Sequence, residues 1–250
     1  MTLRPWDSLL NAADRALVDG YGYGNCQGAG QRPAVIVVDA TYTFVGDTPE
    51  PVTEAIKKRR NACGQQAWDA VAVLRRLLPA ARAKGLPIIY TRADSRPDLA
   101  KFGAPSLKKT PVVQTPSTRN LRDGSTRNLR DGNDIVDEIA PEPGDIVIGK
   151  AKPSAFFGTP LLSYLVALKV DSLFITGGST SGCVRASVVD AFSNNYPVTM
   201  VADACFDRYE ISHAVTLFDL GAKYAEVVTG EDAIARIRGL PDGVFGAPGA

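Results

Sequence analysis

Short apolar runs alternate with longer segments of helical periodicity along most of this chain. The run Ala34–Val38, closed by Asp39, is continuously apolar, which is the pattern of a parallel strand buried on both faces. From Gln65 to Lys84 the apolar residues recur at helical spacing, and Gly85 follows, which is a typical helix end. This region therefore predicts a strand followed by an amphipathic helix.

The same alternation continues toward the C-terminus. Further strands are predicted at residues 87–91, 145–148, 172–176, 198–201 and 225–228, and further helices at 160–169, 183–194, 211–220 and 231–238. Strands that alternate with helices form right-handed βαβ units and parallel sheets. The predicted fold class is therefore α/β, a three-layer α/β/α and Rossmann-like fold with a parallel sheet of about six strands.

Residues 1–32 are expected to form an arm that precedes this domain. They have a mixed composition, are rich in glycine from Gly20 to Gly24, and show one helical pattern near Leu9–Leu17. Residues 33–250 are expected to form a single domain. A chain of 250 residues with 45% hydrophobic content is long enough for one large core and short for two.

An eight-residue segment, Ser117–Gly124, is repeated without change at Ser125–Gly132. Two copies are too few for a repeat architecture, which needs about three or more stacked units. The segment is polar and lies between two predicted strands, so we interpret it as a surface-loop insertion. A lid over a substrate is the alternative interpretation.

The bulk composition argues against several classes of protein. A net charge of +1 does not suggest nucleic acid or an acidic membrane surface as a partner. No apolar run approaches the ~18 residues of a membrane span, and the N-terminal residues MTLRPWDSLL lack the pattern of a secretory signal. We therefore expect a cytoplasmic protein with reduced thiols.

The cysteine and histidine content argues against a metal site. The four cysteines are Cys26, Cys63, Cys183 and Cys205; they include no CxxC pair, and the one histidine is His213. This set does not have the ligand spacing of a zinc site, and we predict no metal and no other cofactor. Cys205 follows a predicted strand and is expected to be a buried thiol.

Three chemically interesting positions fall where predicted strands end. Asp39 ends the first strand, Lys150 lies just past the third, and Gly177 begins the segment after the fourth. In open parallel sheets, ligands bind outside the carboxyl ends of the strands. We therefore expect these positions to meet at one edge of the sheet.

Cys183 lies where the glycine-rich segment GGSTSGC leads into a predicted helix. The unpaired N–H groups and the dipole of a first helical turn favour a thiolate, and the same N–H groups can hold an oxyanion. The position resembles a nucleophile elbow, although the GxSxG motif is absent. Taken alone, the pattern also fits a buried structural cysteine.

A catalytic thiol usually needs a base, and histidine is the usual residue. His213 lies on a predicted helix with Ile211 and Val215, and we expect it at the surface or at a helix cap. Asp39 is placed to act as the base instead, since a buried carboxylate needs a partner that Lys150 can supply, and Lys150 would favour the thiolate. Taken separately, Asp39 also fits a strand-end cap and Lys150 a solvated loop lysine.

At these residues the chain resembles the isochorismatase-like cysteine hydrolases, over about residues 33–230. The matching motifs are Val38–Phe44, in which Phe follows Asp by five residues, Ile148–Thr159 around the lysine, and Thr176–Val184 around the cysteine. The resemblance implies a catalytic triad of Asp39, Lys150 and Cys183.

The same resemblance implies the geometry around the cysteine. A cis peptide bond would lie at Gly178–Ser179, and the backbone N–H groups of Ser179 and Cys183 would form the oxyanion hole. The resemblance also implies a homo-oligomer, a dimer or a tetramer, in which neighbouring subunits help to close the site.

Within the family, the sequence of Ser179–Ala186 is nearly identical to the matching segment of the N-carbamoylsarcosine amidohydrolase subgroup. The pair Asp207-Arg208 also resembles that subgroup's sequence. Arg208 is therefore a candidate to bind a substrate carboxylate, a role that suits a bidentate guanidinium. The alternative is an ordinary surface arginine at the start of a helix.

Three further residues are candidates for binding the substrate. Phe44 and Phe156 are candidates to line the substrate pocket. A role in core packing fits these two residues, and the neighbouring Phe157, equally well. Thr180, in the cysteine motif, is a further candidate contact.

The expected function is hydrolysis of a small linear amide or N-carbamoyl compound, resembling N-carbamoylsarcosine, with release of ammonia through a thioester. The alternatives are a maleamate-type amide hydrolase, a hydrolase of biuret or another ureide, and a non-catalytic binding protein on the same fold. Nicotinamidases of the family bind a metal through Asp and His ligands, and the histidines are missing here. True isochorismatases cleave an enol ether and lack the cysteine, so Cys183 favours C–N bond hydrolysis.

Overall fold

One parallel sheet forms the centre of the protein in the computed structural model, which describes residues 4–21, 30–94 and 131–245. Its strands are β1 Pro33–Val38, β2 Ile88–Ala93, β3 Ile146–Lys150, β4 Ser172–Gly178, β5 Val198–Phe206 and β6 Glu226–Val228. Their order is β3-β2-β1-β4-β5-β6, and every neighbouring pair is parallel. The predicted six-stranded α/β/α fold is confirmed. Cys26 and the octapeptide repeat up to residue 130 lie outside the described residues.

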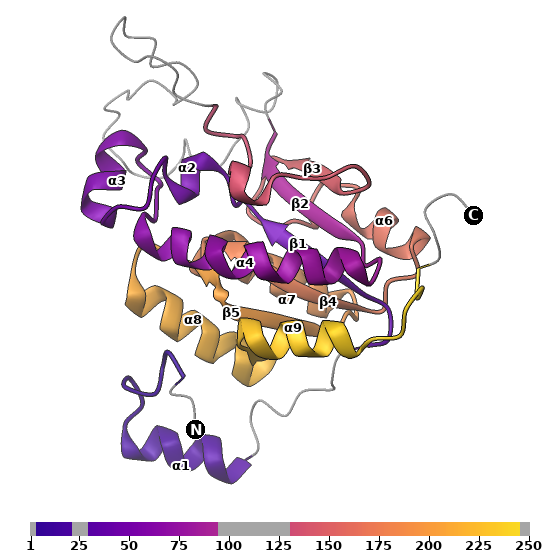
Figure 1. The fold of residues 1–250 in the computed structure, drawn as a ribbon. Helices are drawn as coiled ribbons and strands as arrows, with labels where there is room; N and C mark the ends of the chain where they lie inside the picture. The colour runs from indigo at the N-terminus through magenta and orange to yellow at the C-terminus, as the bar shows by residue number, and fades with distance from the viewer. Residues whose placement is uncertain (1–3, 22–29, 95–130, 246–250) are drawn as a thin grey trace, which may run out of the picture.

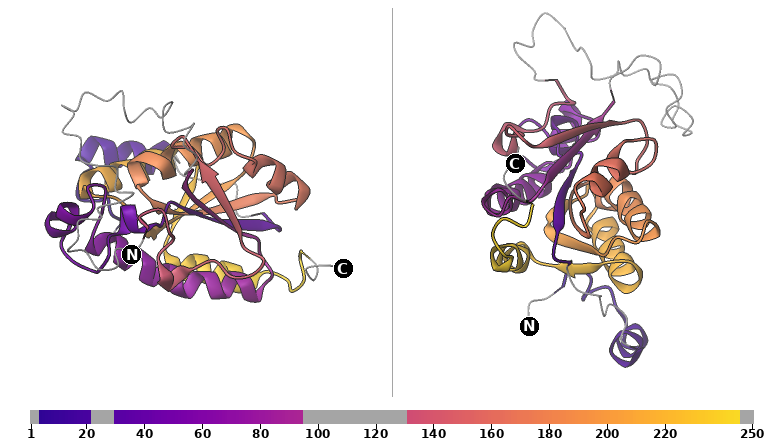
Figure 2. Two further views of the ribbon diagram at one scale, coloured as in Figure 1. Left: turned by 90° about the horizontal axis from the view of Figure 1, so that it is seen from above. Right: turned by 90° about the vertical axis from the view of Figure 1, so that its right-hand side faces the viewer.

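Helices cover both faces of this sheet (Figures 1 and 2). The long helix α4 Gln65–Ala83 and the C-terminal α9 Gly230–Gly239 cover one face. The other face is covered by α6 Leu161–Ala167, α7 Arg185–Ser193 and α8 Glu210–Lys223. The carboxyl ends of the strands all point to the same edge, where the loops into the helices begin.

The central strand β1 explains why its sequence is continuously apolar. All six of its residues are buried. Val35 and Val37 pack with the residues of α4 and α9, whereas Ala34, Ile36 and Val38 pack with those of α6, α7 and α8. Side chains of a strand alternate between the two faces, so a sheet covered on both faces needs apolar residues at every position.

Several short elements were not expected from the sequence. These are α2 Tyr42–Val45, α3 Val52–Lys58 and the 3₁₀ turn η2 Asp137–Ile139, which are too short to show a helical period. The helix predicted at 183–194 begins instead with a π-helical turn, η3 Thr180–Val184, that leads into α7. The third strand includes Lys150, which had been expected just past its end.

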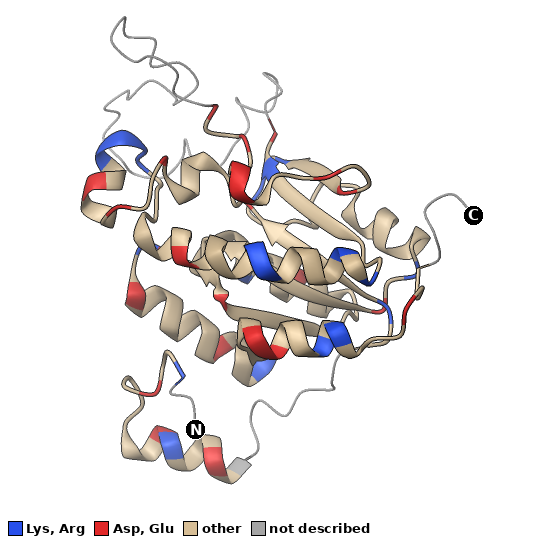
Figure 3. Cartoon of the chain, in the orientation of Figure 1, with Lys and Arg blue, Asp and Glu red and all other residues tan. Residues whose placement is uncertain are grey.

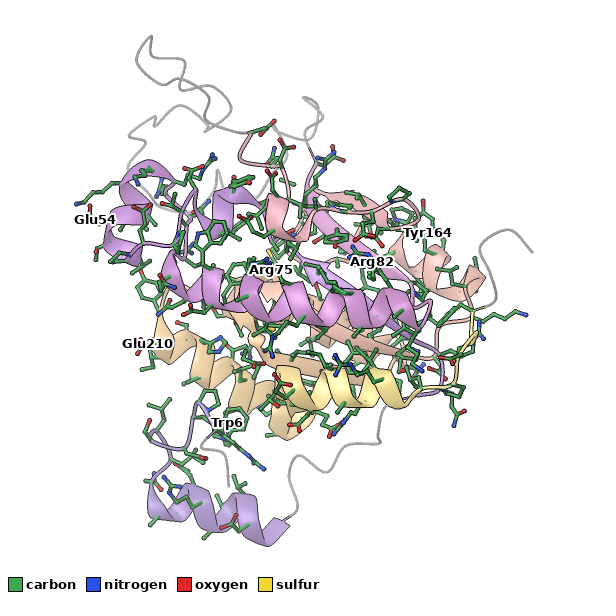
Figure 4. All side chains as sticks on the ribbon, viewed as in Figure 1. Trp6, Glu54, Arg75, Arg82, Tyr164 and Glu210 are labelled. Carbon is green, nitrogen blue, oxygen red and sulfur yellow. The ribbon has the colours of Figure 1, made fainter. Side chains whose placement is uncertain are left out.

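The N-terminal segment lies beside α8 (Figure 1). The helix α1 Ala12–Tyr21 starts later than predicted, and the side chain of Asn11 accepts the N–H of Asp14 at 2.9 Å, which is a typical N-terminal cap. Trp6, labelled in Figure 4, is buried and its ring centroid lies 6.2 Å from that of Phe218 in α8. The division into an arm of residues 1–32 and one domain stays a prediction.

Charged side chains are found mainly on the helices and loops around the sheet (Figure 3). The buried exceptions in the described part of the chain are Asp39, Arg59, Lys150 and Asp207. Arg59 forms an ion pair with Asp47 at 2.7 Å, and the other three lie at the carboxyl edge of the sheet. Within the described ranges, no helix combines the length and the apolar character that a membrane span requires.

Candidate active site

Asp39 and Lys150 form a buried ion pair at the carboxyl edge of the sheet. Asp39 directly follows β1, and Lys150 ends β3, with β2 between these two strands. The Nζ atom of Lys150 lies 2.7 Å from Oδ2 of Asp39, and the two side chains are 5% and 3% exposed. The parallel pairing of three strands therefore joins residues that are more than a hundred positions apart.

The thiol of Cys183 completes this cluster. Lys150 Nζ lies 3.4 Å from Cys183 Sγ and donates to it, and it also donates to the backbone oxygen of Lys152 at 3.2 Å. Cys183 is half-buried, whereas the other two described cysteines, Cys63 and Cys205, are buried. The structure thus brings the three predicted catalytic residues together; their catalytic roles stay predictions.

Thr91 is a member of the cluster that the sequence analysis did not identify. Its hydroxyl donates to Oδ1 of Asp39 at 2.9 Å, and its side chain is fully buried. Thr91 is opposite Val38 in the register of β1 and β2, so its partner is the next residue, Asp39. Both carboxylate oxygens of Asp39 are consequently held, one by Lys150 and one by Thr91.

The electrostatics of the cluster favour a neutral thiol beside a charged pair. Burial and, after it, the negative charge of Asp39 raise the pKa of Cys183, Lys150 opposes the rise, and the resulting pKa is about 12. Burial is the largest effect on Lys150 and tends to lower its pKa, but the charges and hydrogen bonds of Asp39 and Cys183 together outweigh burial, so the pKa is raised. These effects favour a neutral thiol in the resting site rather than the expected thiolate, because burial and the charge of Asp39 outweigh the effect of Lys150.

The segment before Cys183 is shaped by two glycines that have no room for a side chain. Gly177 has a φ of 97°, and a Cβ atom there would lie 2.0 Å from the carbonyl oxygen of Val38. At Gly178 a Cβ atom would lie 2.1 Å from the ring of Phe206. The Gly178–Ser179 peptide bond is cis, as the sequence resemblance implies.

Hydrogen bonds within the turn and from the helix that follows it hold the backbone around Cys183. The carbonyl of Ser179 accepts the N–H groups of Gly182 at 2.9 Å and Val184 at 3.2 Å. The buried hydroxyl of Ser187 donates to the Cys183 carbonyl at 2.7 Å. The oxyanion role of the Ser179 and Cys183 N–H groups stays a prediction.

Ser187 also ties the turn to the lysine segment, because its Oγ accepts the N–H of Ala155 at 2.9 Å. Ser187 lies within α7 and was not among the predicted site residues. The signal that would have found it is a small polar residue on the buried face of α7, since Ser187 is fully buried.

The predicted substrate-binding residues lie in different environments. Arg208 is half-buried, and its Nη1 donates to the carbonyl of Asn61, in the loop before α4, at 2.7 Å. Phe156 is 8% exposed and belongs to the core beneath α6, whereas Phe44 is partly buried against the opposite core. Thr180 is fully buried, so a contact of its side chain with a substrate stays a prediction, as do the other three roles.

His213 does not lie where the sequence analysis expected it. The residue is half-buried rather than at the surface, and its Nδ1 lies 2.8 Å from the hydroxyl oxygen of Thr180. It therefore contacts the cysteine turn and does not cap a helix. Across residues 4–21, 30–94 and 131–245, no group of three or more His, Cys, Asp or Glu residues is arranged to hold a metal ion.

The fold and the site together define an α/β protein of the Rossmann-like class, with a thiol and a buried lysine–carboxylate pair at the carboxyl edge of its sheet. The chain belongs to the isochorismatase family: the Isochorismatase domain matches residues 33–232. The match includes all three residues of the cluster and the cis peptide bond.

Two relatives with curated names match most of the chain. Maleamate amidohydrolase from Pseudomonas putida is 30% identical over 220 residues, which cover 87% of this chain and 92% of the relative. N-carbamoylsarcosine amidase from Arthrobacter sp. is 28% identical over 236 residues, which cover 92% and 80%. A crystal structure of a cysteine hydrolase from Pseudomonas syringae pv. phaseolicola matches the fold with a TM-score of 0.68 at 23% identity, covering 85% of this chain and 96% of that one.

Proposed function

We propose that this protein hydrolyses the C–N bond of a small linear amide or N-carbamoyl compound and releases ammonia through a thioester on Cys183. The observation that carries the proposal is the contact of Lys150 with both the Cys183 thiol at 3.4 Å and the Asp39 carboxylate at 2.7 Å. The names of the two relatives, both of which describe hydrolysis of an amide or carbamoyl group, support the same class of reaction.

The protonation states assign the first proton transfer. Since the pKa of Cys183 is raised to about 12, the sulfur must lose its proton as it attacks the carbonyl carbon. The Asp39 carboxylate is the proposed acceptor, because Lys150 contacts both its Oδ2 at 2.7 Å and Cys183 Sγ at 3.4 Å. Lys150 keeps the carboxylate in place and offsets the negative charge that forms on sulfur.

The reaction then proceeds in two halves. The sulfur attacks the carbonyl carbon, and the N–H groups of Ser179 and Cys183 hold the oxyanion. Asp39 passes its proton to the leaving nitrogen, the C–N bond breaks, and ammonia leaves an acyl- or carbamoyl-thioester. In the second half Asp39 accepts a proton from water, the hydroxide adds to the thioester, and the proton returns to the sulfur as the acid leaves.

The proposed substrate carries a carboxylate as well as the amide or carbamoyl group. Maleamate and N-carbamoylsarcosine, which name the two relatives, both combine a carboxylate with a terminal –CO–NH₂ group on a short chain. Arg208 is the proposed carboxylate ligand, with a guanidinium that changes its partner from the Asn61 carbonyl to the substrate. An N-carbamoyl amino acid is our first candidate, and a maleamate-type amide is the second because that relative shares 30% identity.

A homo-oligomer in the cytoplasm completes the proposal. Apolar side chains are exposed both on the N-terminal segment, at Leu9 and Leu17, and on α8, at Ile211 and Val215. A contact with another copy of the chain would cover them, in a dimer or a tetramer. The described cysteines are free, which suits a reducing compartment.

An ammonia-release screen tests the proposal. The panel contains N-carbamoyl amino acids, maleamate, biuret and nicotinamide, and wild type is compared with Cys183→Ala. We expect ammonia from one of the carboxylate-bearing compounds and none from the variant, whose circular dichroism should match wild type. Turnover that survives in Cys183→Ala, or no ammonia from any compound, would contradict the proposal.

A second variant tests whether Arg208 binds a carboxylate group of the substrate. Arg208→Ala should raise KM at least about tenfold for a carboxylate substrate, since a charge-assisted contact is lost. Arg76→Ala, which removes a surface arginine paired with Glu231, is the control and should leave KM unchanged. If biuret is the best substrate and Arg208→Ala turns it over normally, the ureide alternative holds.

A further inference from the structure

A second buried carboxylate contacts the cysteine turn from the side opposite the catalytic cluster. Asp207 directly follows β5 and is 4% exposed. Its Oδ2 accepts both the backbone N–H of Ser181 at 2.8 Å and the hydroxyl of Ser181 at 2.7 Å. Its Oδ1 accepts the N–H of Arg208 at 2.8 Å. One carboxylate therefore joins the cysteine turn to the junction of β5 and α8.

The one histidine of the chain contacts the preceding residue of the same turn. His213 lies on α8, and its Nδ1 is 2.8 Å from Oγ1 of Thr180, which is fully buried. Burial lowers the pKa of His213, and the charge of Asp207 opposes this effect. The ring is therefore neutral near pH 7, where one of its nitrogens donates and the other accepts.

These two contacts fall on the residues between the proposed oxyanion donors. Thr180 and Ser181 lie between Ser179 and Cys183, so the direction of both N–H groups depends on how this short segment is held. Oxyanion donors are effective only when they are fixed before the reaction, and removal of one lowers kcat about 10²- to 10³-fold. A carboxylate that accepts a backbone N–H forms a strong, charge-assisted bond.

We propose that Asp207 and His213 are positioning residues that hold the Thr180–Ser181 segment so that the Ser179 and Cys183 N–H groups face the oxyanion. The inference rests on the proposed function. It assigns these residues no contact with the reacting atoms, because they act through the turn.

The test separates oxyanion stabilisation from thiol reactivity. For Asp207→Ala and His213→Ala, kcat and KM are measured on the best ammonia-releasing substrate, and alkylation of Cys183 by iodoacetamide is followed by mass spectrometry. We expect kcat to fall about 10- to 100-fold. Alkylation should stay within about twofold of wild type, since a thiolate displaces iodide without an oxyanion. Normal kcat in both variants, or alkylation that falls as far as kcat, would overturn the proposal.

The chain offers a matched control for the aspartate. Asp203 also lies on β5, and its carboxylate accepts a backbone N–H, that of Gly230 at the start of α9, at 2.6 Å. Asp203→Ala removes the same kind of bond without touching the cysteine turn, so kcat should be unchanged. A loss equal to that of Asp207→Ala would show a general structural effect and overturn the positioning role.

The histidine contact is tested by rescue and by a double mutant. The amide of His213→Asn can take the place of Nδ1, so this variant should be more active than His213→Ala. Thr180→Val removes the hydroxyl with little change of shape, and its effect should not add to that of His213→Ala. If the two losses of kcat add in the double mutant, His213 does not act through its hydrogen bond with Thr180.

A second measurement does not depend on activity. Hydrogen exchange of the peptide that contains Ser179–Val184 should be faster in Asp207→Ala and His213→Ala and unchanged in Asp203→Ala. If hydrogen exchange is unchanged in Asp207→Ala and His213→Ala, the positioning proposal is wrong even when wild type releases ammonia. If wild type releases none, the proposed function fails while the exchange result still decides the positioning. Should Asp207→Ala fail to fold, Ser181→Ala and Thr180→Val, which each remove one hydroxyl, take its place.

Discussion

The turn that carries Cys183 is held from two sides, and the two sides differ in what they contact. On the side of β1, β2 and β3, Asp39 and Lys150 act on the sulfur itself. On the side of α8, Asp207 and His213 contact Ser181 and Thr180. The first side changes the pKa of the Cys183 thiol, and we propose that the second side fixes the backbone of the turn around it.

The two sides each contribute one buried aspartate, and these aspartates differ in their hydrogen-bond partners. Asp39 and Asp207 both follow a strand and are 2% and 4% exposed. Asp39 is held by two side chains, those of Lys150 and Thr91, whereas Asp207 accepts two backbone N–H groups and one hydroxyl. A buried carboxylate at a strand end is therefore not diagnostic of catalysis; its partners decide what it does.

The largest expected effect comes from Asp39→Asn. Loss of the proposed base should lower kcat about 10³-fold or more, while alkylation of Cys183 should become faster. The reason is that the negative charge of Asp39 raises the pKa of Cys183, so its removal increases the thiolate fraction at a given pH. Steady-state kinetics and mass spectrometry after iodoacetamide treatment give the two readouts.

The pH dependence of alkylation sharpens the same prediction. In wild type the rate should still rise above pH 9, since the pKa of Cys183 is about 12. In Asp39→Asn the curve should shift to lower pH. A wild-type rate that reaches its plateau near pH 7 would contradict the neutral thiol, and slower alkylation in the variant would contradict the charge effect.

Lys150→Met should have the opposite effect on the sulfur. Lys150 opposes the rise of the Cys183 pKa, so its loss should slow alkylation and lower kcat about 10²-fold. The variant also leaves Asp39 buried without its cation, and the free energy of unfolding should fall by about 3 kcal/mol. Alkylation as fast as in wild type would show that the lysine serves stability alone.

Thr91→Val should have a smaller effect. It removes the hydroxyl that donates to Asp39 and keeps the shape of the side chain, so kcat should fall about tenfold, as expected for loss of one hydrogen bond to a charged group. KM should not change, and Thr91→Ser should recover most of the activity. Equal activity of the valine and serine variants would rule out a role for the hydroxyl.

The sequence predicts the sheet and the cluster because both follow from local patterns. Apolar runs mark the strands, and the carboxyl-edge rule brings Asp39, Lys150 and Cys183 near one another. The role of Thr91 could not be found in this way, since it depends on the register that places Val38 opposite Thr91. The charge state of Cys183 was also missed, because burial of a side chain is not visible in a helix-start pattern.

The placement of His213 was wrong for a different reason, which is the phase of its helix. Ile211 and Val215, the apolar residues that share the predicted helix with His213, are 64% and 47% exposed. The buried face is formed instead by Ala214, Leu217 and Leu220, and His213 lies at the border of the two faces. An apolar residue on the outside of a helix shifts the apparent inner face by about one residue, or 100°.

The smallest effect we predict concerns His213 on the α8 side of the turn and is a dependence of the melting temperature on pH. Because burial lowers the folded-state pKa of His213 below its ordinary value of 6.5, the unfolded chain binds this proton first as pH falls. Stability is therefore lost as pH falls below about 6.5, and the melting temperature of wild type should drop more between pH 7 and pH 5 than that of His213→Asn. The excess should be about 2 °C, since the carboxylates titrate alike in both proteins. Equal drops would mean that His213 carries its proton as easily in the folded protein as in the unfolded chain, and the neutral ring beside Thr180 would have to be abandoned.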